Sequence, residues 1–218
     1  RPVRLANTRE ADLLSSPGRP GLQSRVRLGA KADGTLLAAD IEFWFDSGAY
    51  ADYAVNVSRA AAISCTGPYN IPHVTTDSLC VYTNHPFATA FRGFGHIELS
   101  YATERAMDLL ADKLQMDPAD LRQKNLIREG DLTPTGAPMD ENTGDLGACL
   151  AKVKERLDWN QPHRVELPDG TIRAKGISCF WKAPAIPTFT DAGAVLFFAE
   201  EGSATLSTGV IEIGQGTF

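Results

Sequence analysis

The sequence lacks the cysteine spacing that iron–sulfur and zinc sites need. Its cysteines are Cys65, Cys80, Cys149 and Cys179, and no two of them stand at a C-x-x-C spacing. The histidines are equally scattered along the chain. We therefore predict no iron–sulfur or zinc site within the chain. We expect the cysteines to be small buried residues, and the histidines to lie at the surface or to bond locally.

An excess of positive charge and a long apolar run are also missing. Lys and Arg number 21 against 27 Asp and Glu, which gives a net charge of −6 and an isoelectric point of about 5.2. This balance argues against nucleic acid and anionic membrane surfaces as partners. No apolar stretch is long enough to cross a bilayer. With 43% hydrophobic and 22% charged residues, the composition is typical of a soluble globular protein, which we expect in the cytoplasm.

An initiator methionine is absent as well. The chain begins at Arg1 and stops at Phe218, shortly after a Gly-Gln-Gly sequence. We interpret it as a piece of a longer polypeptide, truncated at both ends, so the lack of a signal peptide says nothing about targeting. Its 218 residues suffice for one or two domains.

The hydrophobic periodicity that is present predicts both strands and helices. The expected strands cover residues 22–28, 36–45, 74–82, 171–181, 194–199 and 204–213. The expected helices cover residues 52–64, 98–114, 117–126 and 146–157, and the stretches 1–20, 129–142 and 159–170 are expected to be irregular. Strands and helices cluster and do not alternate strictly. This order favours an α+β fold with mixed sheets and packed helices.

The most informative stretch is residues 90–95, which read Ala-Phe-Arg-Gly-Phe-Gly and directly precede the longest predicted helix. Glycines at alternate positions allow a sharp bend and a close approach to a ligand. Arg92 can bond an anionic or carbonyl group, Phe94 can lie flat on a planar ligand, and N–H groups before a helix suit an anion. The alternative is an ordinary strand-to-helix turn with a surface arginine and a core phenylalanine.

Other motifs stand around this stretch in a specific order. They include Asp46-Ser47-Gly48-Ala49-Tyr50, Gly67-Pro68-Tyr69-Asn70-Ile71-Pro72, Thr83-Asn84, Asp117-Pro118, Glu129-Gly130-Asp131 and Gly214-Gln215-Gly216. In this order, over nearly the whole chain, the sequence resembles the molybdenum-cofactor-binding large subunit of the xanthine dehydrogenase / aldehyde oxidase family. The resemblance implies a molybdopterin held between two subdomains, here residues 1–128 and 129–218. It also implies that a glycine-rich motif lies upstream and the catalytic glutamate downstream of this chain.

The resemblance also implies roles for particular residues. The backbone at Arg92 and Gly93 would face the cofactor and the ligands of its molybdenum, and Phe94 would stack on an aromatic substrate or form only the cavity wall. Gln215 would contact the pterin, or else be an exposed residue of a turn. Arg59 would be catalytic by orienting the substrate and stabilising negative charge on its ring, or else be a surface arginine on a short helix.

Two departures from family patterns concern the substrate. Where carbon monoxide dehydrogenases of this superfamily place a copper-binding cysteine, this chain has Gly93, which disfavours that chemistry. Many relatives continue with Gly-Gly-Pro-Gln, whereas this chain reads Gly95-His96-Ile97-Glu98. The shape of the substrate pocket therefore stays open.

By resemblance, the expected function is oxidative hydroxylation of a purine, another N-heteroaromatic or an aldehyde, with water as the oxygen source. Electrons would pass to iron–sulfur clusters and usually FAD on other domains or subunits of an oligomer. Alternatives are a relative acting on nicotinate or an aromatic CoA thioester, or a non-catalytic scaffold that kept the fold. Because the catalytic glutamate is expected beyond Phe218, we expect the chain alone to be inactive.

Overall fold

The computed structural model describes residues 2–182, 192–212 and 216. The chain divides into two compact units, Arg1–Ala183 and Pro184–Phe218. Both helices and sheets are present, which confirms the predicted α+β class. The predicted subdomain division between residues 128 and 129 stays a prediction. In the described part of the chain, no helix has the length and apolar character needed to cross a bilayer.

A mixed sheet forms the centre of the first unit. Strand β1 (Gly21–Ala30) pairs antiparallel with β2 (Leu36–Gly48), and β2 pairs parallel with β3 (His73–Tyr82). The predicted period-two face of β2 is confirmed, because Ile41, Phe43 and Phe45 are at most 1% exposed. A parallel pair needs a crossover connection, and a helix between β2 and β3 supplies it.

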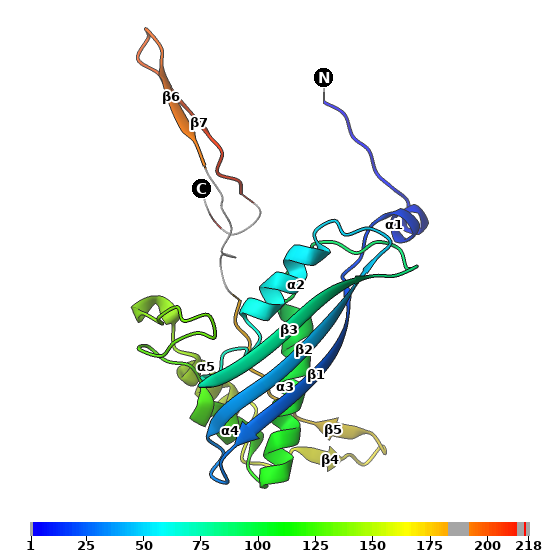
Figure 1. Cartoon of the computed structure of the whole chain (residues 1–218), viewed down its shortest axis with the longest axis vertical. Helices are drawn as coiled ribbons and strands as arrows, with labels where there is room; N and C mark the ends of the chain where they lie inside the picture. The colour runs from blue at the N-terminus through cyan, green and yellow to red at the C-terminus, as the bar shows by residue number, and fades with distance from the viewer. Residues whose placement is uncertain (1, 183–191, 213–215, 217–218) are drawn as a thin grey trace. The chain divides into compact units, whose positions relative to one another are not determined.

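Helices cover the buried face of this sheet (Figure 1). The crossover helix α2 (Ala54–Ile63) packs against β2 and β3, and the long helix α3 (His96–Leu114) packs against β1. Two shorter helices, α4 (Pro118–Asn125) and α5 (Leu146–Arg156), follow, with a 3-10 turn η1 (Glu141–Thr143) between them. As predicted, the Asp117 side chain caps α4 by accepting from backbone N–H groups of its first turn.

Some elements differ from the expectation. Helix α1 (Arg9–Ser15) lies in a stretch that was predicted to be irregular, and its N-cap Thr8 accepts from the N–H of Ala11. Strand β4 (Arg164–Glu166) lies in the stretch that was predicted to be an irregular linker, and it pairs with β5 (Ile172–Ala174), which confirms the first part of the strand predicted over residues 171–181. Residues 175–182 form no strand.

The second unit contains one antiparallel hairpin in its described part. Its strands are β6 (Ala194–Phe198) and β7 (Ala204–Thr208), and they confirm the two strands predicted here. Gly202, at φ +86, lies in the connecting turn, where a left-handed conformation suits glycine. The last strand was predicted to reach residue 213, but it ends at Thr208 and residues 209–212 form no strand; residue 213 lies outside the described residues.

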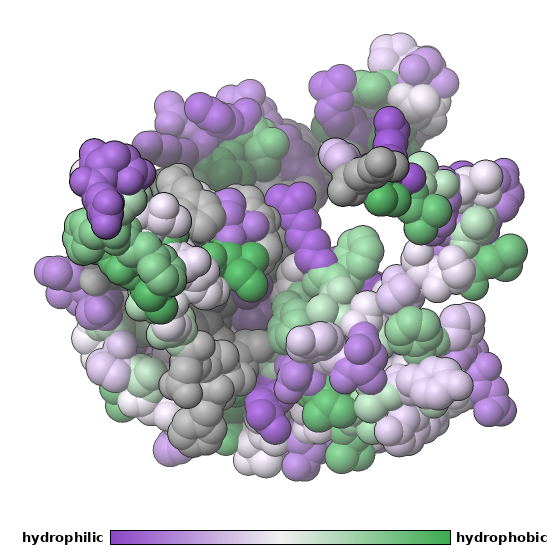
Figure 2. All heavy atoms as spheres, turned by 90° about the horizontal axis from the view of Figure 1, so that it is seen from above, coloured by the Kyte–Doolittle hydropathy of each residue, from purple (hydrophilic) through white to green (hydrophobic). Residues whose placement is uncertain are grey.

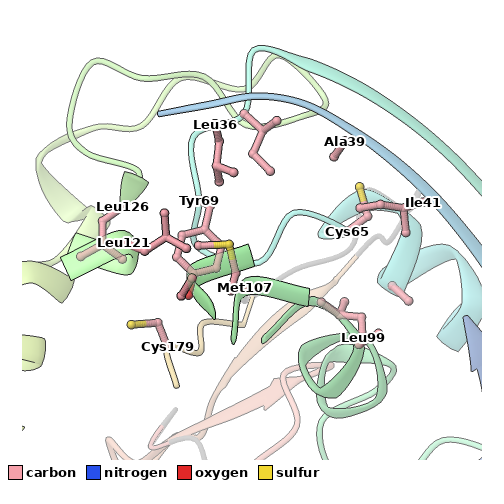
Figure 3. Close-up of a cluster of buried hydrophobic side chains, with 14 of the residues drawn as sticks. Leu36, Ala39, Ile41, Cys65, Tyr69, Leu99, Met107, Leu121, Leu126 and Cys179 are labelled. Carbon is pink, nitrogen blue, oxygen red and sulfur yellow. The ribbon is translucent and has the colours of Figure 1, made fainter. Parts of the chain in front are cut away.

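One hydrophobic core joins the sheet to the helices (Figure 3). It includes Leu36, Ile41, Cys65, Tyr69, Leu99, Met107, Leu121 and Cys179. Burial raises the pKa of both Cys65 and Cys179 to about 11, so these thiols stay protonated at neutral pH. The expectation of buried cysteines was wrong for Cys149, which is exposed, and for Cys80, which is half-buried; all four are free thiols.

A buried polar network lies within this core. The guanidinium of Arg122, which is 0% exposed, donates from Nε to Glu104 Oε2 at 2.8 Å and from Nη2 to Asp108 Oδ1 at 2.8 Å. Glu104 also accepts from the hydroxyl of Tyr69 at 2.5 Å and from the N–H of Cys179 at 2.9 Å. Burial, the largest single influence, would lower the pKa of Arg122, but the charges and hydrogen bonds of Glu104, Tyr69 and Asp108 together raise that pKa. The network ties together α3, α4 and the segment around residue 179.

The surface mixes residue types. On the face that Figure 2 shows, hydrophobic residues lie among hydrophilic ones. Large exposed apolar side chains of the first unit include Tyr50, Tyr82, Tyr101 and Leu132. Singly scattered apolar residues of this kind are ordinary on protein surfaces.

Candidate functional site

The residues predicted to bind the cofactor lie in a tight left-handed turn that leads into α3. Gly93 has φ +105, Phe94 φ +51 and Gly95 φ +89. Within the turn, the N–H of Phe94 donates to the carbonyl of Phe91 at 2.8 Å, and the N–H of His96 donates to the carbonyl of Gly93 at 3.1 Å. A bulky residue with positive φ stores about 1–3 kcal/mol of strain, which proteins tend to keep at functional sites.

Gly95 packs this turn directly onto helix α2. A Cβ at this position would lie 2.4 Å from the carbonyl oxygen of Val57 and 3.3 Å from the amide nitrogen of Ala61. Only glycine can therefore combine this positive φ with so close an approach to the helix backbone. The contact fixes the distance between α2 and the turn.

His96, the first residue of α3, adds a second tie between the turn and α2. Its ring is buried, with Nδ1 3.1 Å from the carbonyl oxygen of Gly93 and Nε2 3.1 Å from the hydroxyl of Ser64. A carbonyl can only accept, so Nδ1 carries the proton and the neutral ring accepts the Ser64 hydroxyl at Nε2. Burial lowers the pKa of His96, which favours this neutral form. The expectation of a locally bonded histidine is confirmed here.

Several backbone donors of the turn are available to a ligand. Among the described residues, the N–H groups of Phe91, Arg92, Gly93 and Gly95 have no acceptor. Phe94 is half-buried next to them, and its ring meets Tyr53 edge-on at 6.5 Å between centroids. Free N–H groups at the start of a helix suit electronegative ligand atoms, and the adjacent ring supplies an apolar surface. The residues present therefore fit a cofactor that presents electronegative atoms to these amides.

The structure does not bring Arg59 to this turn. Arg59 is exposed on α2, two positions from Val57 and Ala61, which face Gly95. At 3.6 residues per turn, Arg59 lies about 200° around the helix from them. Gln215 lies outside the described residues, so its predicted contact with the cofactor stays a prediction.

Sequence analysis missed two residues that hold the turn. Arg19 donates to the carbonyl of Arg92 and to the carboxylate of Glu98. Arg19 sits in a stretch predicted to be an irregular connector, and no motif marks it. The only signal was that Glu98 belongs to the segment that departs from the family pattern.

A mixed sheet whose helices hold a strained, glycine-flanked turn with available amides is suited to bind a cofactor. The sequence profile of the molybdopterin cofactor-binding domain family matches residues 1–126, more than half of the chain, so this chain belongs to that family. The predicted family and the predicted molybdopterin class of cofactor are confirmed.

Three relatives illustrate the range of the family. The chain is 38% identical over 156 residues to the nicotinate dehydrogenase large molybdopterin subunit of Eubacterium barkeri, covering 72% of this chain and 36% of that protein. It is 30% identical over 220 residues to the xanthine dehydrogenase molybdenum-binding subunit of Escherichia coli, covering 99% and 29%. The solved aldehyde oxidoreductase of Desulfovibrio desulfuricans superposes with a TM-score of 0.61 at 30% identity, covering 65% of this chain and 15% of that one. The chain thus spans about a third or less of these relatives.

Proposed function

We propose that this chain is part of a molybdenum hydroxylase that oxidatively hydroxylates an N-heteroaromatic substrate, such as a purine, or an aldehyde, with water as the oxygen source. The observation that carries the proposal is the turn at residues 91–95, where backbone N–H groups without an acceptor in the described part of the chain, those of Arg92 and Gly93 among them, lie beside a half-buried phenylalanine. Bound molybdenum would supply the redox chemistry of the hydroxylation. The chain itself supplies position and electrostatics.

In this proposal each residue of the turn has a separate task. The N–H groups of Arg92 and Gly93 would donate to the cofactor and to the ligands of its metal, and the conformation of the turn leaves both amides available for this role. Phe94 offers its ring to a flat substrate and excludes water beside it. Gln215 uses its amide to bond the pterin edge.

The role of Arg59 needs a special geometry. Its exposed position on α2 faces away from the turn, so a substrate that touched both Phe94 and Arg59 would have to reach around the helix. Arg59 therefore orients a substrate only if the substrate approaches from the exposed face of α2. In that case its charge would stabilise negative charge that develops on the ring.

The remaining parts of the enzyme are proposed to lie outside this chain, which spans only part of its relatives. They are the catalytic base, and iron–sulfur clusters and FAD on other domains or subunits. The whole enzyme is further proposed to be an oligomer in the cytoplasm. The relatives named for nicotinate and xanthine support a nitrogen heteroaromatic as substrate, and the one named aldehyde oxidoreductase supports an aldehyde.

The test uses the full-length protein. We expect stoichiometric molybdenum and pterin in the purified protein, and incorporation of ¹⁸O from labelled water when it oxidises xanthine, nicotinate or benzaldehyde with an artificial electron acceptor. Absence of molybdenum and of any oxidation would instead support the non-catalytic scaffold.

A further inference from the structure

Arg19 reaches the candidate site from far away in the sequence. It is held there by its neighbour Gly18, which forms a bridge with Ala88 and accepts from the N–H of Thr89 at 3.1 Å. The segment before β1 thus runs beside the segment that enters the turn. This placement, and no local motif, brings the Arg19 guanidinium to Arg92, 73 positions along the chain.

The guanidinium of Arg19 contacts two residues of the turn and one residue of the first helical turn of α3. Nη1 donates to Glu98 Oε1 at 3.0 Å, Nη2 donates to the carbonyl oxygen of Arg92 at 2.5 Å, and the group lies 4.9 Å from the centroid of the Phe91 ring. The side chains of Arg19 and Glu98 are only 27% and 6% exposed. Charge-assisted hydrogen bonds in such a shielded place are strong and directional.

Glu98 makes this arrangement dependent on Arg19. Its second carboxylate oxygen, Oε2, is buried and has no partner among the described residues. A buried carboxylate needs a compensating charge, and the ion pair with Arg19 supplies it. The first turn of α3 and the turn before it are therefore held against the same cation.

The geometry of the peptide bond carries this restraint to the free amides. A trans peptide is planar, so its C=O and its N–H point in opposite directions. The carbonyl of Phe91 is held by the N–H of Phe94, which fixes the direction of the Arg92 N–H. The carbonyl of Arg92 is held by Arg19, which fixes the direction of the Gly93 N–H. Gly93 itself has no side chain to resist a peptide flip.

We propose that Arg19 is a positioning residue of the site, which orients the Gly93 N–H toward the cofactor. The ion pair with Glu98 holds the Arg19 guanidinium in the position that this requires. This inference rests on the proposed function. A lysine could preserve the charge beside Glu98, but it lacks the planar fork that bonds the carboxylate and the Arg92 carbonyl at fixed angles.

The experiment compares Arg19→Lys and Arg19→Gln with the control Arg25→Lys in the full-length holoenzyme. Arg25 also pairs with a glutamate, Glu42, at 2.9 Å and lies 5.6 Å from the centroid of the Trp44 ring, but it belongs to β1 and does not contact the turn. The readouts are the rate at which molybdenum leaves the protein and the Mo(V) electron paramagnetic resonance spectrum of the loaded fraction.

We expect both Arg19 variants to release molybdenum about tenfold faster or more, because loss of an outer-shell partner typically weakens metal binding by that factor. We also expect a shifted Mo(V) spectrum in Arg19→Lys and no change in either readout for Arg25→Lys. An unchanged spectrum in Arg19→Lys would overturn the inference, even if release were faster, since Arg19 would then only support the fold. Failure of the proposed function would appear earlier, as wild-type protein without molybdenum.

Discussion

At the scale of single residues, Phe94 combines a strained backbone with a ring that can meet a ligand. Its φ of +51 is unusual for an aromatic residue, and the N–H of Phe94 closes the turn that exposes the Arg92 amide. The ring is half-buried against Tyr53, which leaves part of it accessible. Ring and backbone of this residue can therefore be separated by mutation.

Replacing Phe94 by alanine in the intact enzyme should change the preference between substrates. The loss of an aromatic contact worth about 0.5–1.5 kcal/mol lowers kcat/KM for a flat aromatic substrate, and a small aliphatic aldehyde, which has no ring, should lose less. The measurement is the ratio of kcat/KM values for the two substrates, taken at equal molybdenum content. Equal losses for both would contradict stacking and leave Phe94 as part of the cavity wall.

His96 should make stability depend on pH. Burial lowers its pKa in the folded protein below the usual value of about 6.5, so the unfolded chain binds more protons between those two values. The stabilising contribution of the neutral His96 ring to the free energy of unfolding is therefore complete above pH of about 6.5. This contribution is lost as the pH falls from there toward the lowered pKa.

Urea unfolding at a series of pH values should give a smaller decrease in stability on acidification for His96→Gln than for the wild type. A His96→Gln curve parallel to the wild type would show that the ring does not titrate differently on folding.

At the scale of elements, the Glu104–Arg122 pair couples α3 to α4. Replacing Arg122 by methionine leaves a buried carboxylate without compensation, which typically costs about 3–5 kcal/mol. We expect a loss of that size in the free energy of unfolding measured in urea. The exposed pair of Lys124 and Asp33 is the control, because Lys124→Met should change stability by less than about 1 kcal/mol. Similar effects for the two variants would refute a structural role for the buried pair.

Elements whose burial leaves a periodic pattern are among those that were predicted correctly. Strand β2 alternates buried and less buried residues, and α3 repeats apolar residues at helical spacing. Residues 175–182 look like a strand but form none, because the N–H of Cys179 finds its acceptor in the buried carboxylate of Glu104. A side-chain acceptor 75 positions away cannot be read from local sequence.

The same distinction applies to the candidate site. The spacing of glycines around Arg92 marked the turn, because a left-handed bend leaves a local signature. The contacts of Arg19 with Arg92 and Glu98 span 73 and 79 positions and depend on how the segment before β1 packs. Such long-range contacts leave no periodicity, and only the folded chain reveals them.

At the scale of the whole molecule, the chain offers only part of a cofactor site. It spans 36% and 29% of two of its relatives, and the proposed contacts of molybdopterin include segments outside it. We therefore expect the isolated 218-residue chain, expressed in a host that makes the cofactor, to contain no tightly bound molybdenum. Elemental analysis beside the full-length protein is the measurement. Stoichiometric molybdenum in the isolated chain would contradict the expectation.

Hydrogen exchange at the backbone amides of the turn should report whether a ligand occupies the site. The N–H groups of Phe94 and His96 donate to carbonyls of the same turn, whereas those of Arg92 and Gly93 have no acceptor among the described residues. In deuterated water the first pair should exchange slowly and the second pair quickly. A ligand that accepts from Arg92 and Gly93 would slow only the fast pair. Comparison of deuterium uptake at Phe94 and His96 with that at Arg92 and Gly93 thus measures occupancy of the site without an assay of activity.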